Sequence, residues 1–286
     1  MRMRPAVAVT FLTATLSASM LPATAQAADR TAADDTTFSN VVVNGGKDIV
    51  LGLTTRKTVT ITWTAHDPQG VAASWAYLWH GPNTDDADGA IPLYPPTGAC
   101  VVSPADPATS TCKVSLAVDA ARDFDHNGLA GAWKVLAGAQ DATDEWTEID
   151  EAGTANFKRY AKVTVNAAPE PVKKGRTITV TGKLTRANWD SGSYTGYQDR
   201  PVQLQFRKKG SSVYTTLKTV TSGVGGTLKT TTRAKTDGYF RFVFAGTPTT
   251  GPATAAGDFV DRRLSLINKR HSRTKKKFLK KLWGEK

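Results

Sequence analysis

The sequence predicts an all-β protein that contains two antiparallel β-sandwiches, and three observations support this fold class. Thr, Val and Gly are abundant, and no long helical pattern occurs between residues 28 and 261. Apolar and polar residues alternate over several short segments, which is typical of strands buried on one face. Turn clusters such as Asn44-Gly45-Gly46 and Asp88-Gly89 separate these segments. Short strands joined by turns favour a pair of packed sheets.

The formal net charge of +12 is distributed unevenly along the chain. Residues 28–166 carry 10 basic and 18 acidic residues, whereas residues 167–261 carry 14 basic and 6 acidic residues. Residues 262–286 carry 11 basic residues and 1 acidic residue. The sequence therefore predicts an acidic domain, a basic domain and a cationic tail.

Residues 1–27 have the pattern of a cleaved secretory signal peptide. Arg2 and Arg4 precede an apolar stretch over residues 6–21, and Ala25-Gln26-Ala27 is a small-residue cleavage site. The apolar stretch is short for a membrane span, so an uncleaved anchor is the less favoured alternative. The protein is therefore expected to be secreted into the extracellular space.

Several segments of the acidic domain alternate strictly. In residues 57–65, one face of the expected strand is apolar and the other face is lined by threonines. The expected inward residues are Val59, Ile61, Trp63, Ala65, Val114, Leu116, Val118, Trp133, Val135 and Ala137. The same domain contains the only two cysteines, Cys100 and Cys112. In an exported chain, two cysteines that close a short loop predict a disulfide, here across a hairpin.

A proline-containing connector over residues 166–171 marks the predicted domain boundary, with the second domain covering residues 167–261. Pro169 and Pro171 favour an extended and fairly stiff chain there. Beyond the connector the alternating pattern restarts. The expected core residues are Ile178, Val180, Leu184, Val202, Leu204, Phe206, Phe240, Phe242 and Phe244, and residues 214–220 suggest a further, less regular strand.

The second domain resembles a known family. The stretches VKKGRTITVTGKLTRANW, PVQLQFRKKGSSVY, TDGYFRFVFAGTPTT and GDFVD are similar to the C-terminal immunoglobulin-like module of small, secreted, two-domain actinobacterial proteins. The acidic domain resembles the divergent immunoglobulin-like module that precedes it in those proteins. The resemblance implies two immunoglobulin-like sandwiches in tandem. Its members are mostly uncharacterised, and some are described as calcium-binding.

Residues 123–128 match the first half of an EF-hand calcium loop. Asp123, Asp125 and Asn127 are the candidate Ca²⁺ ligands, because calcium prefers several hard oxygens on a tight turn. Lys134 stands where such a loop needs a bidentate Glu. An Asx-rich turn between strands is therefore the favoured alternative to a calcium site.

Two groups of aromatic residues could stack on sugar rings. Trp75, Tyr77 and Trp79 share one face of a strand, and we expect them to fill the sandwich core. Trp189 lies in a Gly/Ser-rich loop and is the better exposed of the candidates for glycan binding, although a loop-anchoring tryptophan is the ordinary explanation.

The sequence offers little support for catalysis. His66, His80, His126 and His271 form no metal-binding spacing, and there is no G-x-S-x-G elbow. The chain is therefore expected not to be an enzyme, and a secreted hydrolase is the least favoured reading.

Residues 262–286 form a cationic tail that is expected to be disordered or a short amphipathic helix. Together with a basic hairpin, the tail supplies the candidate polyanion-binding residues Lys208, Lys209, Lys275, Lys276, Lys277, Lys280 and Lys281. The expected partner is an anionic cell-wall polymer or membrane surface, and no specific nucleic acid is predicted. The sequence thus predicts a secreted, non-enzymatic binding or structural protein, with a calcium-binding extracellular protein as the alternative.

Overall fold

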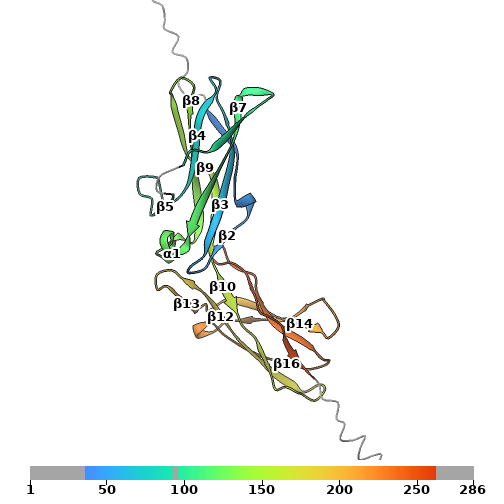
Figure 1. Cartoon of the computed structure of the whole chain (residues 1–286). Coiled ribbons are helices and arrows are strands. Elements are labelled where there is room, and N and C mark those ends of the chain that lie inside the picture. The colour runs from blue at the N-terminus through green and yellow to red at the C-terminus, as the bar shows by residue number, and fades with distance from the viewer. Residues whose placement is uncertain (1–35, 93–95, 262–286) are drawn as a thin grey trace, which may run out of the picture. The chain divides into compact units, whose positions relative to one another are not determined.

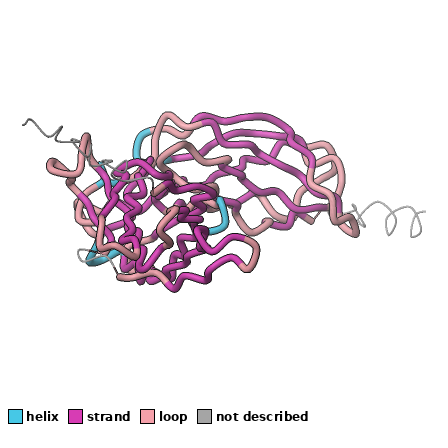
Figure 2. Tube along the Cα trace, turned by 90° about the horizontal axis from the view of Figure 1, so that it is seen from above, coloured by secondary structure: helices cyan, strands magenta, loops and turns pink. Residues whose placement is uncertain are grey.

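The structure is a computed structural model that describes residues 36–92 and 96–261 (Figure 1). Strands make up most of this part of the chain (Figure 2), so the predicted all-β fold is confirmed. The expected signal peptide (residues 1–27) and cationic tail (residues 262–286) lie outside the described residues. The helical segments are single turns: α1 (Ala120–Asp123), η1 (Asn44–Gly46), η2 (Asn127–Leu129) and η3 (Val224–Gly226). No helix in the described ranges is long and apolar enough to span a membrane.

Two sheets form the first sandwich. One has the strand order β1-β3-β7-β6 and the other has the order β2-β9-β8-β4-β5. The strands are β1 (Thr37–Val43), β2 (Ile49–Leu51), β3 (Arg56–His66), β4 (Val71–His80), β5 (Gly89–Ile91), β6 (Ala99–Ser103), β7 (Asp106–Asp119), β8 (Gly131–Asp141) and β9 (Trp146–Arg159). These orders correspond to the ABED sheet and the extended GFC sheet of a variable-type immunoglobulin domain.

The core of this sandwich contains the residues that the alternating pattern predicted. Val59, Ile61 and Trp63 on β3 are at most 1% exposed, and Trp133 and Val135 on β8 face them from the other sheet. Antibody domains join the equivalent strands by a disulfide. Here Trp63 on β3 reaches the other sheet, where its Nε1 donates to Oγ of Ser74 on β4 at 2.8 Å.

The predicted disulfide is present, but it joins neighbouring strands of one sheet. Cys100 on β6 pairs with Cys112 on β7, and the two residues face each other across the hairpin. Cys112 is fully buried beneath the hairpin, so the bond fixes the β6–β7 edge to the core.

The second sandwich also has immunoglobulin-type strand order. In one sheet β12 pairs with β10, β11, β13 and β16, and the other has the order β15-β14-β17-β18 with β19 also on β17. The strands are β10 (Ala161–Val163), β11 (Asn166–Ala168), β12 (Thr177–Asn188), β13 (Ser193–Gly196), β14 (Pro201–Lys208), β15 (Thr215–Thr221), β16 (Thr227–Arg233), β17 (Gly238–Phe244), β18 (Ala253–Thr254) and β19 (Asp258–Val260). The predicted core residues Ile178, Val180, Phe240 and Phe242 are almost fully buried.

The second sandwich begins earlier than the sequence predicted. β10 pairs with β12, and Ala161 and Val163 belong to the second core. β11 also pairs with β12, and Val172, beyond the two prolines, is 4% exposed in the same core. Residues 166–171 are therefore part of the second sandwich and not a connector between domains. The apolar alternation of residues 161–165 was assigned to the wrong module because periodicity does not reveal which sheet a strand joins.

Candidate anion-binding site

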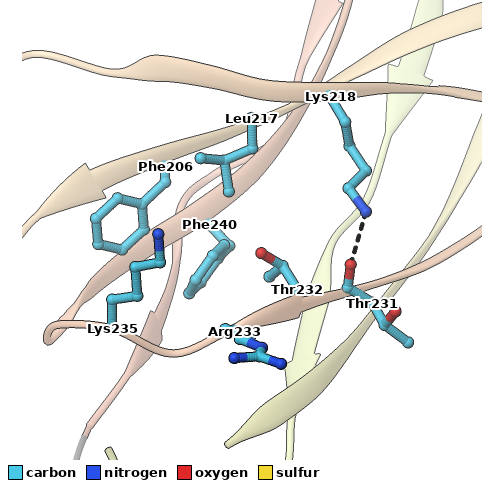
Figure 3. Close-up of a pocket in the computed structure, with 8 residues that line it drawn as sticks. All are labelled: Phe206, Leu217, Lys218, Thr231, Thr232, Arg233, Lys235 and Phe240. Atoms are coloured by element: carbon cyan, nitrogen blue, oxygen red, sulfur yellow. Dashed lines mark hydrogen bonds between the residues drawn. The ribbon is translucent and has the colours of Figure 1, made fainter. Parts of the chain in front are cut away.

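A cleft of about 370 Å³ opens in the second sandwich between β15 and β16 (Figure 3). These two strands are the outermost strands of their sheets, so the cleft lies where the two layers of the sandwich separate. It is lined by Phe206, Leu217, Lys218, Thr231, Thr232, Arg233, Lys235 and Phe240. The cleft thus combines aromatic carbon with positive charge.

The aromatic floor of the cleft follows from the composition of β15. Phe206 and Phe240 point between the sheets from β14 and β17, with their ring centroids 4.9 Å apart. Residues 215–219 of β15 are all exposed, and Leu217 is their only large apolar side chain. Because β15 contributes so few inward apolar groups, it leaves Phe206 only half-buried and accessible from the cleft.

Positive charge surrounds this floor. Lys218 reaches from β15 across to β16, where its Nζ donates a hydrogen bond to the carbonyl oxygen of Thr231 at 2.8 Å (Figure 3). Arg233 and Lys235 are exposed at the same edge. Among the described residues that line the cleft, none is acidic. The cleft therefore presents an electrostatic field that attracts anions.

The predicted hairpin lysines lie beside this cleft. Lys208 ends β14, and both Lys208 and Lys209 are exposed. The backbone N–H of Lys209 donates to the carbonyl oxygen of Asp237 at 2.9 Å, which ties the hairpin to the turn that carries Lys235. The structure thus brings this pair close to cations that the sequence analysis did not select. The other predicted polyanion-binding lysines (275, 276, 277, 280 and 281) lie outside the described residues.

A ladder of cations and rings covers the outer face of the sheet that contains β14 and β17. Its members are Arg207, Tyr214, Tyr239 and Arg241. The Arg207 guanidinium lies 4.1 Å from the Tyr239 ring centroid and 5.2 Å from that of Tyr214, and Arg241 lies 3.6 Å from Tyr214. Hydrogen bonding with Tyr214 raises the pKa of Arg207. Arg207 and Arg241 also donate to neutral oxygens, those of Ser211 and Gln205. Cations held by aromatic rings keep their charge available to an external anion.

Trp189 is buried, so the expectation that it is exposed for glycan binding is wrong. Its side chain is 6% exposed and belongs to the core cluster of the first sandwich. The ring centroid lies 4.8 Å from that of Phe124, and Nε1 donates to the carbonyl oxygen of Gly52 at 3.1 Å. Trp189 therefore acts as an anchor between the strand end after β12 and the first sandwich. Sequence alone does not reveal this contact because its partners are more than 60 residues away.

The predicted calcium ligands each have a protein partner. Asp123 accepts a hydrogen bond from the Asp119 N–H at 2.7 Å and pairs with Arg122. Asp125 pairs with His126 at 2.7 Å. The side-chain oxygen of Asn127, the atom that would bind calcium, accepts from the Trp189 N–H at 3.0 Å.

Asn127 also serves as a link to the loop that follows β12. Its side-chain amide donates to Asn188 and Asp190, and its backbone N–H donates to Asp190 at 2.9 Å. Asp88, Asp123 and Asp125 line a cavity of about 500 Å³ together with Arg122. Within the described ranges, no three His, Cys, Asp or Glu side chains are grouped to hold a metal. Calcium binding stays a prediction.

The expectation that Trp75 and Tyr77 fill the sandwich core is also wrong. The core-facing residues of β4 are Ser74, Ala76 and Leu78, whereas Trp75 and Tyr77 are half-buried on the outer face. Trp79 shares that outer face and is buried there, where its Nε1 donates to the Asp150 carbonyl oxygen at 2.6 Å. The strand was predicted correctly, but its two faces were exchanged.

By its fold and its cleft, the protein is an all-β protein with two immunoglobulin-type sandwiches, the second of which carries a cleft lined by cations and aromatic rings. No family model and no curated protein matches the chain. Similar solved structures include the mouse nectin-like molecule 4 ectodomain (16% identity, 78% of this chain and 64% of that chain, TM-score 0.25). Another is a 1.5-MDa bacterial ice-binding adhesin (14% identity, 80% of this chain and 66% of that chain, TM-score 0.26). A third is the Escherichia coli adhesin FdeC (14% identity, 78% of this chain and 64% of that chain, TM-score 0.30). The chain spans about two thirds of the length of these structures, and none of the likenesses is close enough to assign a function.

Proposed function

We propose that this protein is a non-enzymatic, extracellular binding protein that attaches to anionic polymers of the cell envelope through its second sandwich. The cleft between β15 and β16 is the observation that carries the proposal. It offers Lys218, Arg233 and Lys235 around an aromatic floor, with no acidic residue in its lining. The basic hairpin and the ladder of cations and rings extend the positive surface beside it.

The chemistry of these groups favours a polymer over a small anion. The cations are mostly exposed and spread along two strand edges and a hairpin, so each contributes a weak, screened attraction. A repeating anion can engage several of them at once, which raises the overall affinity by effective concentration. Binding is therefore expected at low salt and lost at high salt.

Retention on isolated cell walls and on dextran sulfate, with uncharged dextran as the reference, tests the proposal. A triple variant, Lys218→Gln, Arg233→Gln and Lys235→Gln, is expected to weaken retention roughly ten-fold, from three exposed ion pairs at about 0.5 kcal/mol each.

A second triple variant provides the matched control. Lys47→Gln, Lys57→Gln and Lys113→Gln removes the same charge from exposed positions on the first sandwich and should have little effect. Equal losses in the two triple variants would show that only net charge matters and would contradict a role for the cleft.

The cationic tail is expected to add a second attachment point. Deletion of residues 262–286 should lower retention further in the cleft variant, because two sites act together. If the deletion alone abolishes retention and the cleft variant binds normally, the tail is the binding element and the cleft is not.

A further inference from the structure

The first sandwich presents an aromatic surface that its core does not use. This aromatic platform lies on the outer face of the sheet that contains β4, β8 and β9, and it comprises Trp75, Tyr77, Trp146 and Glu148. Trp146 is 64% exposed, and Trp75 and Tyr77 are half-buried beside it. Large aromatic groups that stay accessible together on one sheet face indicate an interaction surface.

The indole of Trp75 is held across the neighbouring strand. Trp75 pairs with Gly138 on β8, and a Cβ atom at Gly138 would overlap the indole ring. Its Nε1 donates to Oε1 of Glu148 at 3.0 Å, which fixes the ring in its plane. The Trp146 ring lies beside it, with centroids 5.2 Å apart and planes inclined by 57°. The two indoles thus form a preorganised pair of aromatic faces that are inclined to each other.

The platform has negative charge around it. Glu148 and Asp150 are exposed on β9. The pKa of Tyr77 is raised by burial and by the charges of Glu148 and Asp150, consistent with a negative field at this face. The nearby cation Lys134 is engaged, because its Nζ lies 2.5 Å from Glu151 and 4.3 Å from the Trp79 ring centroid.

We propose that the aromatic platform binds a cationic amino-sugar polymer, that is, a chain of glucosamine-type units. The apolar face of a pyranose ring can stack on the exposed indole of Trp146, with the inclined indole of Trp75 beside it. An ammonium group on the same ring is attracted both by the carboxylates and by the aromatic faces. A lysine side chain would satisfy the charge but would cover much less of the flat indole surface.

This site is independent of the proposed attachment to anionic polymers. It lies on the other sandwich and selects ligands of the opposite charge. A protein with both sites would join an anionic polymer to a cationic one.

Glucosamine hexamer and N-acetylglucosamine hexamer make a matched pair of probes, because they share the sugar ring and differ in charge. At mildly acidic pH, where the amines are protonated, titration calorimetry and tryptophan fluorescence should show binding of the glucosamine hexamer and at least ten-fold weaker binding of the acetylated one. Trp146→Ala and Glu148→Gln should each weaken binding at least five-fold. Both substitutions are at exposed positions, so the melting temperature should be unchanged.

Three results would overturn the proposal. Equal binding of both hexamers would show that charge plays no part, and equal or tighter binding of hexalysine would indicate a peptide ligand. Absence of binding, or full binding by Trp146→Ala, would remove the platform as the site. The cleft variant with Lys218→Gln, Arg233→Gln and Lys235→Gln should bind the glucosamine hexamer normally, so failure of the two proposals can be told apart.

Discussion

Replacement of Trp189 by Ala is the most informative test of how the chain is held together. Trp189 follows β12 of the second sandwich, yet its ring is packed among core residues of the first sandwich, beside Phe124. We expect Trp189→Ala to destabilise the protein strongly, although the residue lies in a polar, glycine-containing loop.

The magnitude follows from two contributions. Truncation of a buried tryptophan costs about 3–5 kcal/mol through lost packing and the cavity left behind. About 1 kcal/mol of this reflects the carbonyl oxygen of Gly52, which would lose its hydrogen bond from Nε1. Trp189→Phe keeps most of the ring and loses the N–H group, so it should cost roughly 1–2 kcal/mol.

Calorimetry and urea unfolding of the full chain would measure these losses. Trp146→Ala is the matched control, since it removes the same side chain from a position that is 64% exposed and should change stability by less than about 0.5 kcal/mol. If Trp189→Ala and Trp146→Ala had the same small effect, Trp189 would not be an anchor, and the sandwiches would be stable independently of it.

Three further predictions concern the first sandwich. Cys112→Ser should lower stability by about 3 kcal/mol in urea unfolding, because the disulfide closes a loop with a sequence separation of 12; an unchanged midpoint would contradict this. The hydrogen bond to Asp125 raises the pKa of His126, so the stability that protonated His126 provides is present below its unfolded pKa of about 6.5 and is lost as pH rises through the raised value. Melting temperatures measured from mildly acidic to mildly alkaline pH should show this loss, and His126→Gln should flatten it. Calcium is predicted to raise the melting temperature, with the shift abolished in a variant that combines Asp123→Ala and Asp125→Ala; no shift in the wild type would end the calcium hypothesis.

The sequence predicted the strands better than it predicted their partners. Alternation placed Val59, Ile61 and Trp63 correctly in the core, because a buried face imposes a period of two on any sheet. The disulfide also followed from local information, since its two cysteines lie on one hairpin. Trp75 and Tyr77 show the limit of the method. Period two separates two faces but does not say which face is covered, and large aromatic residues occur on both.

None of the residues that line the candidate cleft was selected as a site residue from the sequence, for a physical reason. Lys208 and Lys209 are adjacent in sequence and could be recognised as a basic hairpin. The cations of the cleft, by contrast, come from different strands that meet only through the sandwich topology. Phe206 is accessible because β15 has few apolar side chains that could cover it. Such a site is a property of strand order and not of any local motif.

The distribution of charge takes on a specific meaning once the surfaces are located. The acidic half carries exposed carboxylates beside the exposed indole of Trp146, whereas the basic half carries exposed cations beside an accessible phenylalanine floor. In both halves the charge lies next to aromatic carbon, which solubility alone does not require. Mutual neutralisation of the two halves would not require charged side chains to lie next to accessible aromatic rings. The two proposed binding surfaces, of opposite charge preference, would account for both the charge division and the accessible rings, and the hexamer and cell-wall assays test the two surfaces separately.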